Sequence, residues 1–417
     1  MSTAPATFDT LSADPQAVRR ENATMAIVGV AHGTSHFFHL TLAPLFPWLK
    51  DAFALSYAEL GLLVTVFFVV SSIGQALSGF LVDRVGAFPV MMAALGCFVL
   101  AACALAAAPG YAGLMLGAVL CGVGNAPFHP VDYSILNARI GPTRLGKAYA
   151  VHGVSGSLGW ALAPVLLVSV AQVAGWRMAF LAAGLVALAM MALIWRFRDL
   201  LQGVGGTGSA AQAAAGAPAA SPFGFLRLPA VWMSFGFFFA WAAALGGVLT
   251  FGPEAARTLH QMPVSWLAMC VTTFMLASAL GMGVGGYLVT DPTRADQVVA
   301  VSLAVSTVVA LLIAWSAWPA WTVPPLFALM GLGMGLAGPS RDLLVKRATP
   351  PGATGRVYGM VYSGLDVGMS VSPTAFGMMM DANHPAWVWV GIAAFQAALI
   401  GSALNIARMT GLRVRPA

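Results

Sequence analysis

Charged residues are scarce in this chain: Asp, Glu, Lys and Arg together make up 8% of its 417 residues. The mean hydropathy is correspondingly high, at +0.84. A water-soluble protein of this length needs more polar surface than such a composition supplies. A bilayer removes that need, because a helix that crosses it satisfies its own backbone hydrogen bonds. The composition excludes an ordinary soluble protein and predicts an all-α membrane protein.

Cysteine is also rare, and the signatures of several enzyme classes are missing. The four cysteines lie inside apolar stretches at spacings that match no disulfide framework and no zinc knuckle. There is no Gly-x-x-x-x-Gly-Lys-Ser/Thr phosphate loop and no dinucleotide fingerprint. We therefore expect no enzyme activity and no cofactor, and any energy requirement would be met by an ion gradient. The net charge of +6 is spread over short loops, so we expect no nucleic-acid partner.

Twelve apolar stretches of about 20–25 residues are each long enough to span a bilayer. They fall near residues 24–49, 58–82, 88–108, 111–138, 147–171, 177–197, 229–252, 264–290, 297–318, 322–347, 355–380 and 386–408. A stretch of small residues separates the first six spans from the last six. The expected domains are a tail over 1–23, a six-helix bundle over 24–200, a flexible linker over 201–227, a second six-helix bundle over 228–408 and a tail over 409–417.

The basic residues predict the orientation of these spans. With the N-terminus inside, sixteen of the 20 lysines and arginines lie in inner loops and tails, and only Lys50, Arg177 and Arg257 lie in outer loops. Positive charge in short loops is retained on the cytoplasmic side. Residues 1–23 also lack the apolar core of a cleaved signal. We therefore expect a multi-pass protein of the inner membrane, with both tails and the linker cytoplasmic.

The two blocks of six spans resemble each other. Aligning the chain on itself with an offset of 209 pairs glycines and prolines over some forty residues. The pairs include Gly122 with Gly331, Gly124 with Gly333, Pro130 with Pro339, Gly159 with Gly368 and Pro164 with Pro373. Glycine and proline determine helix contacts and bends. Parallel repeats of this kind occur in secondary transporters, with substrate bound between the halves.

The loop after the second span carries Gly79, Asp83, Arg84 and Gly86. It resembles the Gly-x-x-x-Asp-Arg-x-Gly signature of the major facilitator superfamily, although further basic residues usual in that signature are absent. The resemblance implies twelve transmembrane helices in two six-helix pseudo-repeat bundles. It also implies that Asp83 and Arg84, together with Arg139, act in gating.

Three further segments are similar to the fosmidomycin-resistance branch of that superfamily. They are SHFFH at 35–39, FHP at 128–130 and the run from His152 to Pro164. The branch implies efflux, but its members need not share a substrate. The fifth span, 147–171, also carries Gly159-x-x-x-Ala163-Pro164, which is similar to an antiporter pattern without its closing pair of glycines. Because the second half has the same arrangement at Gly368, we interpret it as a packing device.

Polar side chains inside membrane spans are costly, so each needs a reason. His32, His36 and His39 follow the spacing i, i+4, i+7 and share one face of the first span. We expect His36 and His39 to line a cavity and bind substrate, and His36 also to bind a proton. The alternative is that these histidines hold neighbouring helices together. No cysteine or carboxylate shares their face, so we expect no metal site.

The fourth and tenth spans carry further polar residues. Asn125 and His129 are expected to contact substrate, because nearby prolines bend the helix towards a cavity. Asp132 and Arg341 are counterparts under the offset of 209. Three interpretations of Arg341 stay open: a latch to Asp132 across the halves, a site for an anionic substrate, or a pairing with Asp342 or lipid phosphate.

Asp366 is the carboxylate expected nearest the middle of the membrane. Its repeat counterpart is Ser157, so its charge is not a shared structural requirement. We expect Asp366 and Asp132 to take part in proton coupling, because protonation removes the cost of a buried charge. A static pair with a histidine or with Arg341 is the alternative. Trp241 is expected in the cavity wall, and His152 is expected to face a loop or to pack.

These observations together favour a secondary transporter that works by alternating access. Proton-coupled efflux of a small organic or anionic solute is the first interpretation, and proton-coupled uptake of a small organic anion is the second. A membrane receptor or scaffold without transport, and an intramembrane metal enzyme, represent other classes. The expected partners are a small-molecule substrate, protons and the lipid bilayer, and we expect a monomer.

Overall fold

A computed structural model describes residues 15–204, 229–288, 295–315, 318–348 and 354–409, and these residues are almost entirely helical. The first half contains α1 (Pro15–His39), α2 (Phe46–Phe53), α3 (Tyr57–Val85), α4 (Ala87–Ala106), α5 (Tyr111–Asn125), α6 (Phe128–Arg139), α7 (Leu145–Ala174), α8 (Trp176–Arg196) and α9 (Arg198–Leu201). The second half contains α10 (Pro229–Thr250), α11 (Gly252–His260), α12 (Trp266–Leu288), α13 (Ala295–Ala314), α14 (Val323–Ala348), α15 (Thr354–Asp381) and α16 (Pro385–Met409). Most of the expected tails and linker fall outside the described residues.

Every expected span corresponds to a helical segment of the structure. Ten of the described segments are long and apolar enough to cross a membrane. The two remaining spans, α1 and α15, are less apolar because they carry the histidines and Asp366. Both helices line the cavity described below, where polar side chains need not face lipid. The chain is therefore a multi-pass membrane protein, and α1 and α15 place polar side chains at a cavity rather than against lipid.

Two spans differ in detail from simple continuous helices. The first begins at Pro15, inside the expected tail, and its helix ends at His39 rather than near residue 49. A short turn and α2 follow, and each begins with a proline near its start. The fourth span is broken at Ala126–Pro127 into α5 and α6, because a proline in mid-helix removes a donor and crowds the preceding turn.

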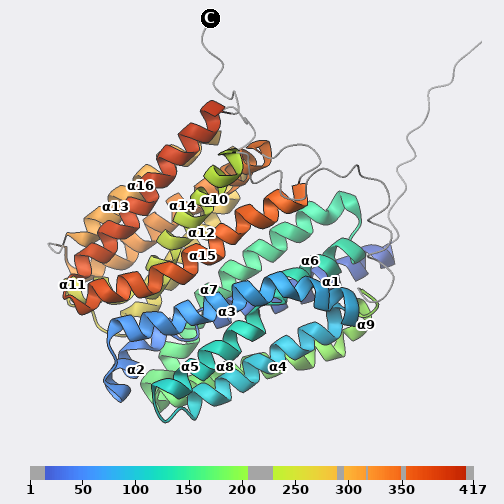
Figure 1. The fold of residues 1–417 in the computed structure, drawn as a ribbon, viewed down its shortest axis with the longest axis horizontal. Coiled ribbons are helices and arrows are strands. Elements are labelled where there is room, and N and C mark those ends of the chain that lie inside the picture. The colour runs from blue at the N-terminus through green and yellow to red at the C-terminus, as the bar shows by residue number, and fades with distance from the viewer. Residues whose placement is uncertain (1–14, 205–228, 289–294, 316–317, 349–353, 410–417) are drawn as a thin grey trace, which may run out of the picture.

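The two halves are built on the same packing scheme (Figure 1). Within the first half, α1 packs on α7, α3 on α5, and α4 on α5 and α8. Within the second half, α10 packs on α15, α12 on α14, and α13 on α14 and α16. The halves meet along α3 with α15 and α7 with α12, which are equivalent pairs. The sequence repeat therefore reflects a shared architecture of two six-helix bundles.

Equivalent glycines make equivalent contacts in the two halves. A β-carbon at residue 122 would lie 2.6 Å from the carbonyl oxygen of Phe67 on α3, and one at residue 331 would strike the carbonyl of Phe274 on α12. Gly159 and Gly368 likewise meet the carbonyls of Gly33 and Phe239. Small residues allow helix backbones to approach closely in membranes. These contacts support the interpretation of the Gly159 and Gly368 patterns as packing devices.

Close contacts join the halves at the end of the bundle away from Pro15 and Met409, which we call the distal end. The carboxylate of Asp381, at the end of α15, accepts hydrogen bonds from the backbone N–H groups of Tyr57 (2.7 Å) and Ala58 (2.8 Å), at the start of α3. The Tyr57 hydroxyl donates to Glu254, which also pairs with Arg257 as its i, i+3 spacing predicts. The distal end is therefore held shut across the two halves.

Candidate functional site

A cavity of about 270 Å³ lies between the two halves. Side chains from α1, α3, α6 and α7 form one wall, and side chains from α10, α12, α14 and α15 form the other. The first wall is polar, with His36, His39 and His129. The second wall is largely apolar, with several methionines and Trp241, and it carries Asp366. The cavity therefore presents one face rich in imidazole and one face that suits apolar groups.

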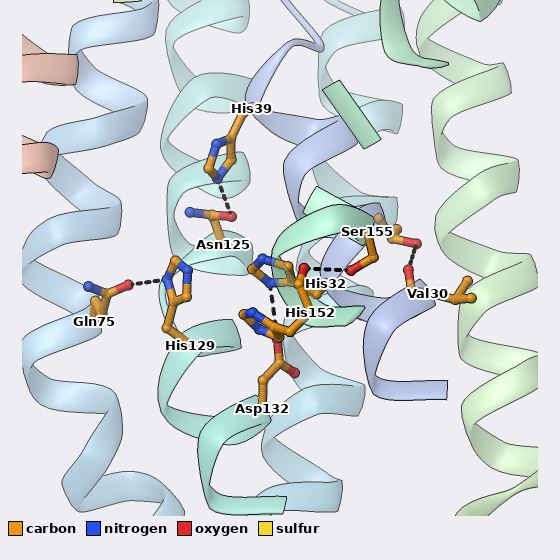
Figure 2. A network of polar contacts seen from close by, with 10 residues as sticks. Val30, His32, His39, Gln75, Asn125, His129, Asp132, His152 and Ser155 are labelled. Carbon is orange, nitrogen blue, oxygen red and sulfur yellow. Dashed lines mark hydrogen bonds and ion pairs between the residues drawn. The ribbon is translucent and has the colours of Figure 1, made fainter. Parts of the chain in front are cut away.

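The three histidines of α1 lie on one face of the helix, as their spacing predicts, and each has different partners. Figure 2 shows His32 and His39. His39 Nε2 forms a 2.9 Å hydrogen bond with the Asn125 side chain. Trp160 Nε1 donates to His39 Nδ1. Neither ring nitrogen of His36 has a hydrogen-bond partner among the described residues, although both atoms are buried. His36 is thus the histidine of the cavity wall whose bonding capacity is unused.

His32 belongs to a buried cluster beneath the cavity wall. Its Nδ1 lies 3.2 Å from Asp132 Oδ2, and His152 Nε2 lies 3.1 Å from the same oxygen. Asp132 is fully buried, and His32 and His152 are 2% and 4% exposed. The two imidazole rings stack at 3.4 Å between centroids. A buried carboxylate is tolerated here because two imidazoles from α1 and α7 surround it.

A chain of hydrogen bonds crosses the cavity from one half to the other. His129 Nδ1 and Gln75 Oε1 are 2.9 Å apart. The Gln75 amide nitrogen donates to Asp366 Oδ2 over 3.4 Å, which is a long bond. Gln75 therefore connects a histidine of α6 with the carboxylate of α15. His129 and Asp366 thus share Gln75 as a hydrogen-bonding partner.

The remaining expected site residues divide into three groups. Asn125 is buried and donates to the Ser71 hydroxyl while it contacts His39, so it reaches the cavity only through that histidine. Arg139 is exposed and donates to the backbone carbonyl of Gln202, and Arg84 is exposed at the end of α3. The side chains of Asp83 and Arg341 lie outside the part of the structure that is described. The interpretations of those two residues stay predictions.

Asp132 has its partners within its own half. It contacts His32 and His152, both of the first bundle. Its expected role in proton coupling and its expected latch to Arg341 stay predictions.

The sequence pattern did not identify three residues that the structure brings to the site. His152 packs, which was one of its two expected placements, but the sequence did not indicate its partners: it is buried against Asp132 and stacked on His32. Gln75 connects the two walls, and the Trp160 ring lies 4.2 Å from the His36 ring between centroids. The cost of placing an imidazole or an amide in a membrane span was the available signal. It applies to His152 and Gln75 as it does to His36.

Two groups of potential metal ligands occur among the described residues. One ring nitrogen from each of His32, His36 and His129 lies within 4.8 Å of the others. The second group contains His32, Asp132 and His152 and is fully buried. The expectation of no metal site considered only the face of the first span. The fold adds ligands from α6 and α7 that this face lacks.

Comparison with known proteins identifies the family. Residues 25–373 and 264–410 match the sequence profile described as Major Facilitator Superfamily. Among curated relatives, the fosmidomycin resistance protein of Escherichia coli is 26% identical over 203 residues, covering 47% of this chain and 49% of the relative. The membrane sensor protein UhpC of Salmonella typhimurium is 30% identical over 156 residues, covering 36% and 34%. The chain thus aligns with about a third to a half of the length of these relatives.

Solved structures agree on the fold over the whole chain. A nucleoside transporter, NupG, gives a TM-score of 0.74 at 13% identity, covering 93% of this chain and 99% of that one. A bacterial homologue of the human lysosomal transporter Spinster, in an inward-facing and occupied conformation, gives 0.69 at 15% identity, covering 95% and 99%. At such low sequence identity, these structural matches establish the fold alone. The resemblance read from the loop after the second span is confirmed, and the chain belongs to the Major Facilitator Superfamily, a family of transporters rather than of enzymes.

Proposed function

We propose that this protein moves a small organic or anionic solute across the inner membrane by alternating access, in exchange for protons. The observation that carries the proposal is the cavity of about 270 Å³ between the halves, with histidines on one wall and Asp366 on the other. Its volume is near the lower end of ligand sites, which suits a small solute. Imidazole offers donors and acceptors to an anion, and the methionine-rich wall accepts an apolar part.

Proton coupling is proposed to act through Asp366. The carboxylate accepts a hydrogen bond from Gln75 of the other half. A proton on Asp366 removes a charge that is costly inside a membrane and weakens this link, which favours a different arrangement of the halves. The other titratable groups of the described cavity wall are His36, His39 and His129. Arg341 belongs to the neighbouring α14, but its side chain is outside the described residues.

The proposed state of the structure is closed at the distal end. Asp381, Tyr57 and Glu254 join the halves there. Most lysines and arginines lie in loops and tails expected at the end opposite the distal end. We therefore propose that this opposite end is cytoplasmic and carries both termini. The cavity would then receive solute from the cytoplasm, as efflux requires.

A transport assay tests the function and its direction together. Purified protein is reconstituted into liposomes whose lumen is acidic, and uptake of candidate carboxylates, phosphonates and antibiotics is measured. Exchange for protons predicts accumulation in the acidic lumen, which stops when an ionophore removes the gradient. Proton-linked uptake, the alternative, predicts instead that preloaded solute leaves with the protons. Binding of a solute without movement under either gradient would contradict transport.

A sensor is the second candidate function, and one observation favours it. The relative named membrane sensor protein UhpC is 30% identical over 156 residues. A sensor would bind a solute in the same cavity and change shape without turnover. It predicts that replacing Asp366 leaves solute-induced structural change intact and that no solute crosses a liposome membrane. A transporter predicts movement that depends on Asp366.

A further inference from the structure

We propose that the polar wall of the cavity binds a divalent first-row transition-metal ion through His32, His36 and His129. The three imidazoles come from two helices that the fold brings together, α1 and α6. One ring nitrogen of each lies within 4.8 Å of the other two. The site adjoins the cavity of the proposed transport function, but its set of ligands does not depend on that function.

The ring positions fit a common central ion. The centroids of His32 and His36 are 4.3 Å apart, those of His32 and His129 are 5.2 Å apart, and those of His36 and His129 are 6.3 Å apart. A point equidistant from three centroids so spaced lies about 3.2 Å from each. A metal–nitrogen bond of about 2.0–2.1 Å, with roughly 1.1 Å more from nitrogen to ring centre, gives nearly the same distance. The planes of these three rings are tilted by 53° to 76° relative to one another, so the three do not stack on each other.

An oxygen atom already lies close to the Nδ1 atom of two of the three rings, and for His129 it forms a hydrogen bond. The Nδ1 atom of His32 lies 3.2 Å from the Asp132 carboxylate, and the Nδ1 atom of His129 lies 2.9 Å from the Gln75 amide oxygen. Metal-binding histidines usually donate one ring N–H to such an oxygen, which fixes the other nitrogen as a ligand. In this arrangement the Nε2 atoms of His32 and His129 are the ligand atoms.

His36 supplies the second, independent indication of a missing ligand. Both of its ring nitrogens are buried without a hydrogen-bond partner among the described residues. A buried polar group without a partner is costly, so an occupant that coordinates His36 would remove that cost. The space is also kept clear: a β-carbon at residue 156 would lie 2.6 Å from His36 Nδ1 and 3.1 Å from His32 Nε2. Gly156 therefore leaves room where these two nitrogens converge.

The donor set determines the class of ion. Imidazole nitrogens suit Zn²⁺, Cu²⁺, Ni²⁺ and Fe²⁺, whereas Mg²⁺ and Ca²⁺ require oxygen ligands. Three neutral imidazoles leave a double positive charge, of which Asp132 offsets one through His32. Because His36 and His129 line the cavity, the fourth position faces the space that a solute would occupy. A water molecule or an anionic group of the solute completes the coordination there.

Metal binding is tested on the full-length protein in detergent. The protein is purified with an affinity tag free of histidine, stripped with a chelator and titrated with ZnCl₂ in a calorimeter. We expect saturation near one ion per chain, together with a rise in unfolding temperature as Zn²⁺ is added. Co²⁺ in place of Zn²⁺ should give the visible absorption bands of a tetrahedral nitrogen site.

Variants distinguish this site from adventitious binding. His36→Phe keeps a ring in place and loses no hydrogen bond, so we expect it to fold as the wild type does and to bind Zn²⁺ at least tenfold more weakly. If the His36→Phe variant is unstable, His129→Gln removes a different ligand and tests the same prediction. His39→Gln is the matched control, because His39 shares the helix and the cavity but is outside the ligand group. Its affinity for Zn²⁺ should change little.

Two results would overturn the proposal. One is folded wild-type protein that shows no saturable Zn²⁺ binding. The other is undiminished binding by folded His36→Phe or His129→Gln, which would assign the ion to surface ligands. Failure of metal binding alongside proton-driven transport would leave the proposed function standing. Metal binding without any solute movement would contradict only the proposed function.

Discussion

Single residues carry most of the chemistry proposed for this protein, because a membrane interior contains few polar groups. Asp366 is the acidic residue of the described cavity wall, and Gln75 links it to His129. Replacing Asp366 by Asn keeps its size and a hydrogen-bond acceptor but removes the titratable charge. We expect proton-driven accumulation of solute to fall at least tenfold, with exchange of solute at equal pH retained.

Two activities of the Asp366→Asn variant are measured in the same liposomes: uptake of solute under a pH gradient, and counterflow of solute without a gradient. Asp366→Glu is the control, since it restores a titratable group one methylene further from the helix. Equal loss of both activities would indicate a binding or structural role for Asp366. Normal gradient-driven uptake by Asp366→Asn would remove this residue from proton coupling.

Gly156 tests whether the histidines need the space beside them. A β-carbon there would lie 2.6 Å from His36 Nδ1, so both His36 and His32 must shift to admit an alanine. We expect Gly156→Ala to weaken binding of Zn²⁺ and of transported solute at least tenfold, about 1.4 kcal/mol. Gly153→Ala is the matched control on the same helix, because Gly153 lines the cavity with no atom within 4 Å of its added β-carbon. Similar effects of the two variants would point to a general cost of alanine in α7.

At the scale of elements, α15 and α3 join the two halves at the distal end. Asp381 accepts from the first N–H groups of α3, so a carboxylate of one half caps a helix of the other. Such caps contribute about 0.5–2 kcal/mol. We expect Asp381→Asn to shift the population several-fold towards a state open at this end. Distances between spin labels at Ala52 and His384, in a background without native cysteines, measure that shift.

Glu59→Gln is the control for the Asp381 variant. Glu59 caps the same helix, through the backbone and hydroxyl of Ser56, but both partners belong to its own half. It should lower stability without changing the distance between the halves. A shift of equal size in both variants would mean that fraying of α3, rather than loss of the contact across halves, opens the distal end.

The elements themselves were largely predictable, since long apolar stretches can satisfy their backbones only as helices. The ends of α4, α8 and α16 lie within a few residues of the expected spans. The break between α5 and α6 follows from Pro127, whose bending effect was anticipated. The spacing of residues along the sequence did not show which helix faces pack against each other. The face shared by His32, His36 and His39 was evident, but Asp132 and His152 join it only because α6 and α7 pack against α1.

At the scale of the whole molecule, two related halves have acquired different walls. Gly122 and Gly331 make the same packing contact, so the architecture is repeated. The cavity residues are not repeated: histidines belong to the first half, and Asp366 occupies a position whose counterpart is Ser157. A symmetric scaffold allows the halves to rock about a common centre. In the proposed mechanism, one half holds polar groups of a solute while the other responds to a proton.

The orientation of this scaffold decides what the cavity faces, and its charges predict that orientation. Lys147 is exposed in the first turn of α7, at the end expected to be cytoplasmic, whereas Lys50 lies in α2 at the distal end. With the native cysteines replaced, a membrane-impermeant maleimide applied to intact cells should label Lys50→Cys and spare Lys147→Cys. Permeabilised cells should label both, which controls for reactivity. The reverse pattern would place the closed distal end in the cytoplasm, and the cavity of this structure would then receive solute from outside, as uptake rather than efflux requires.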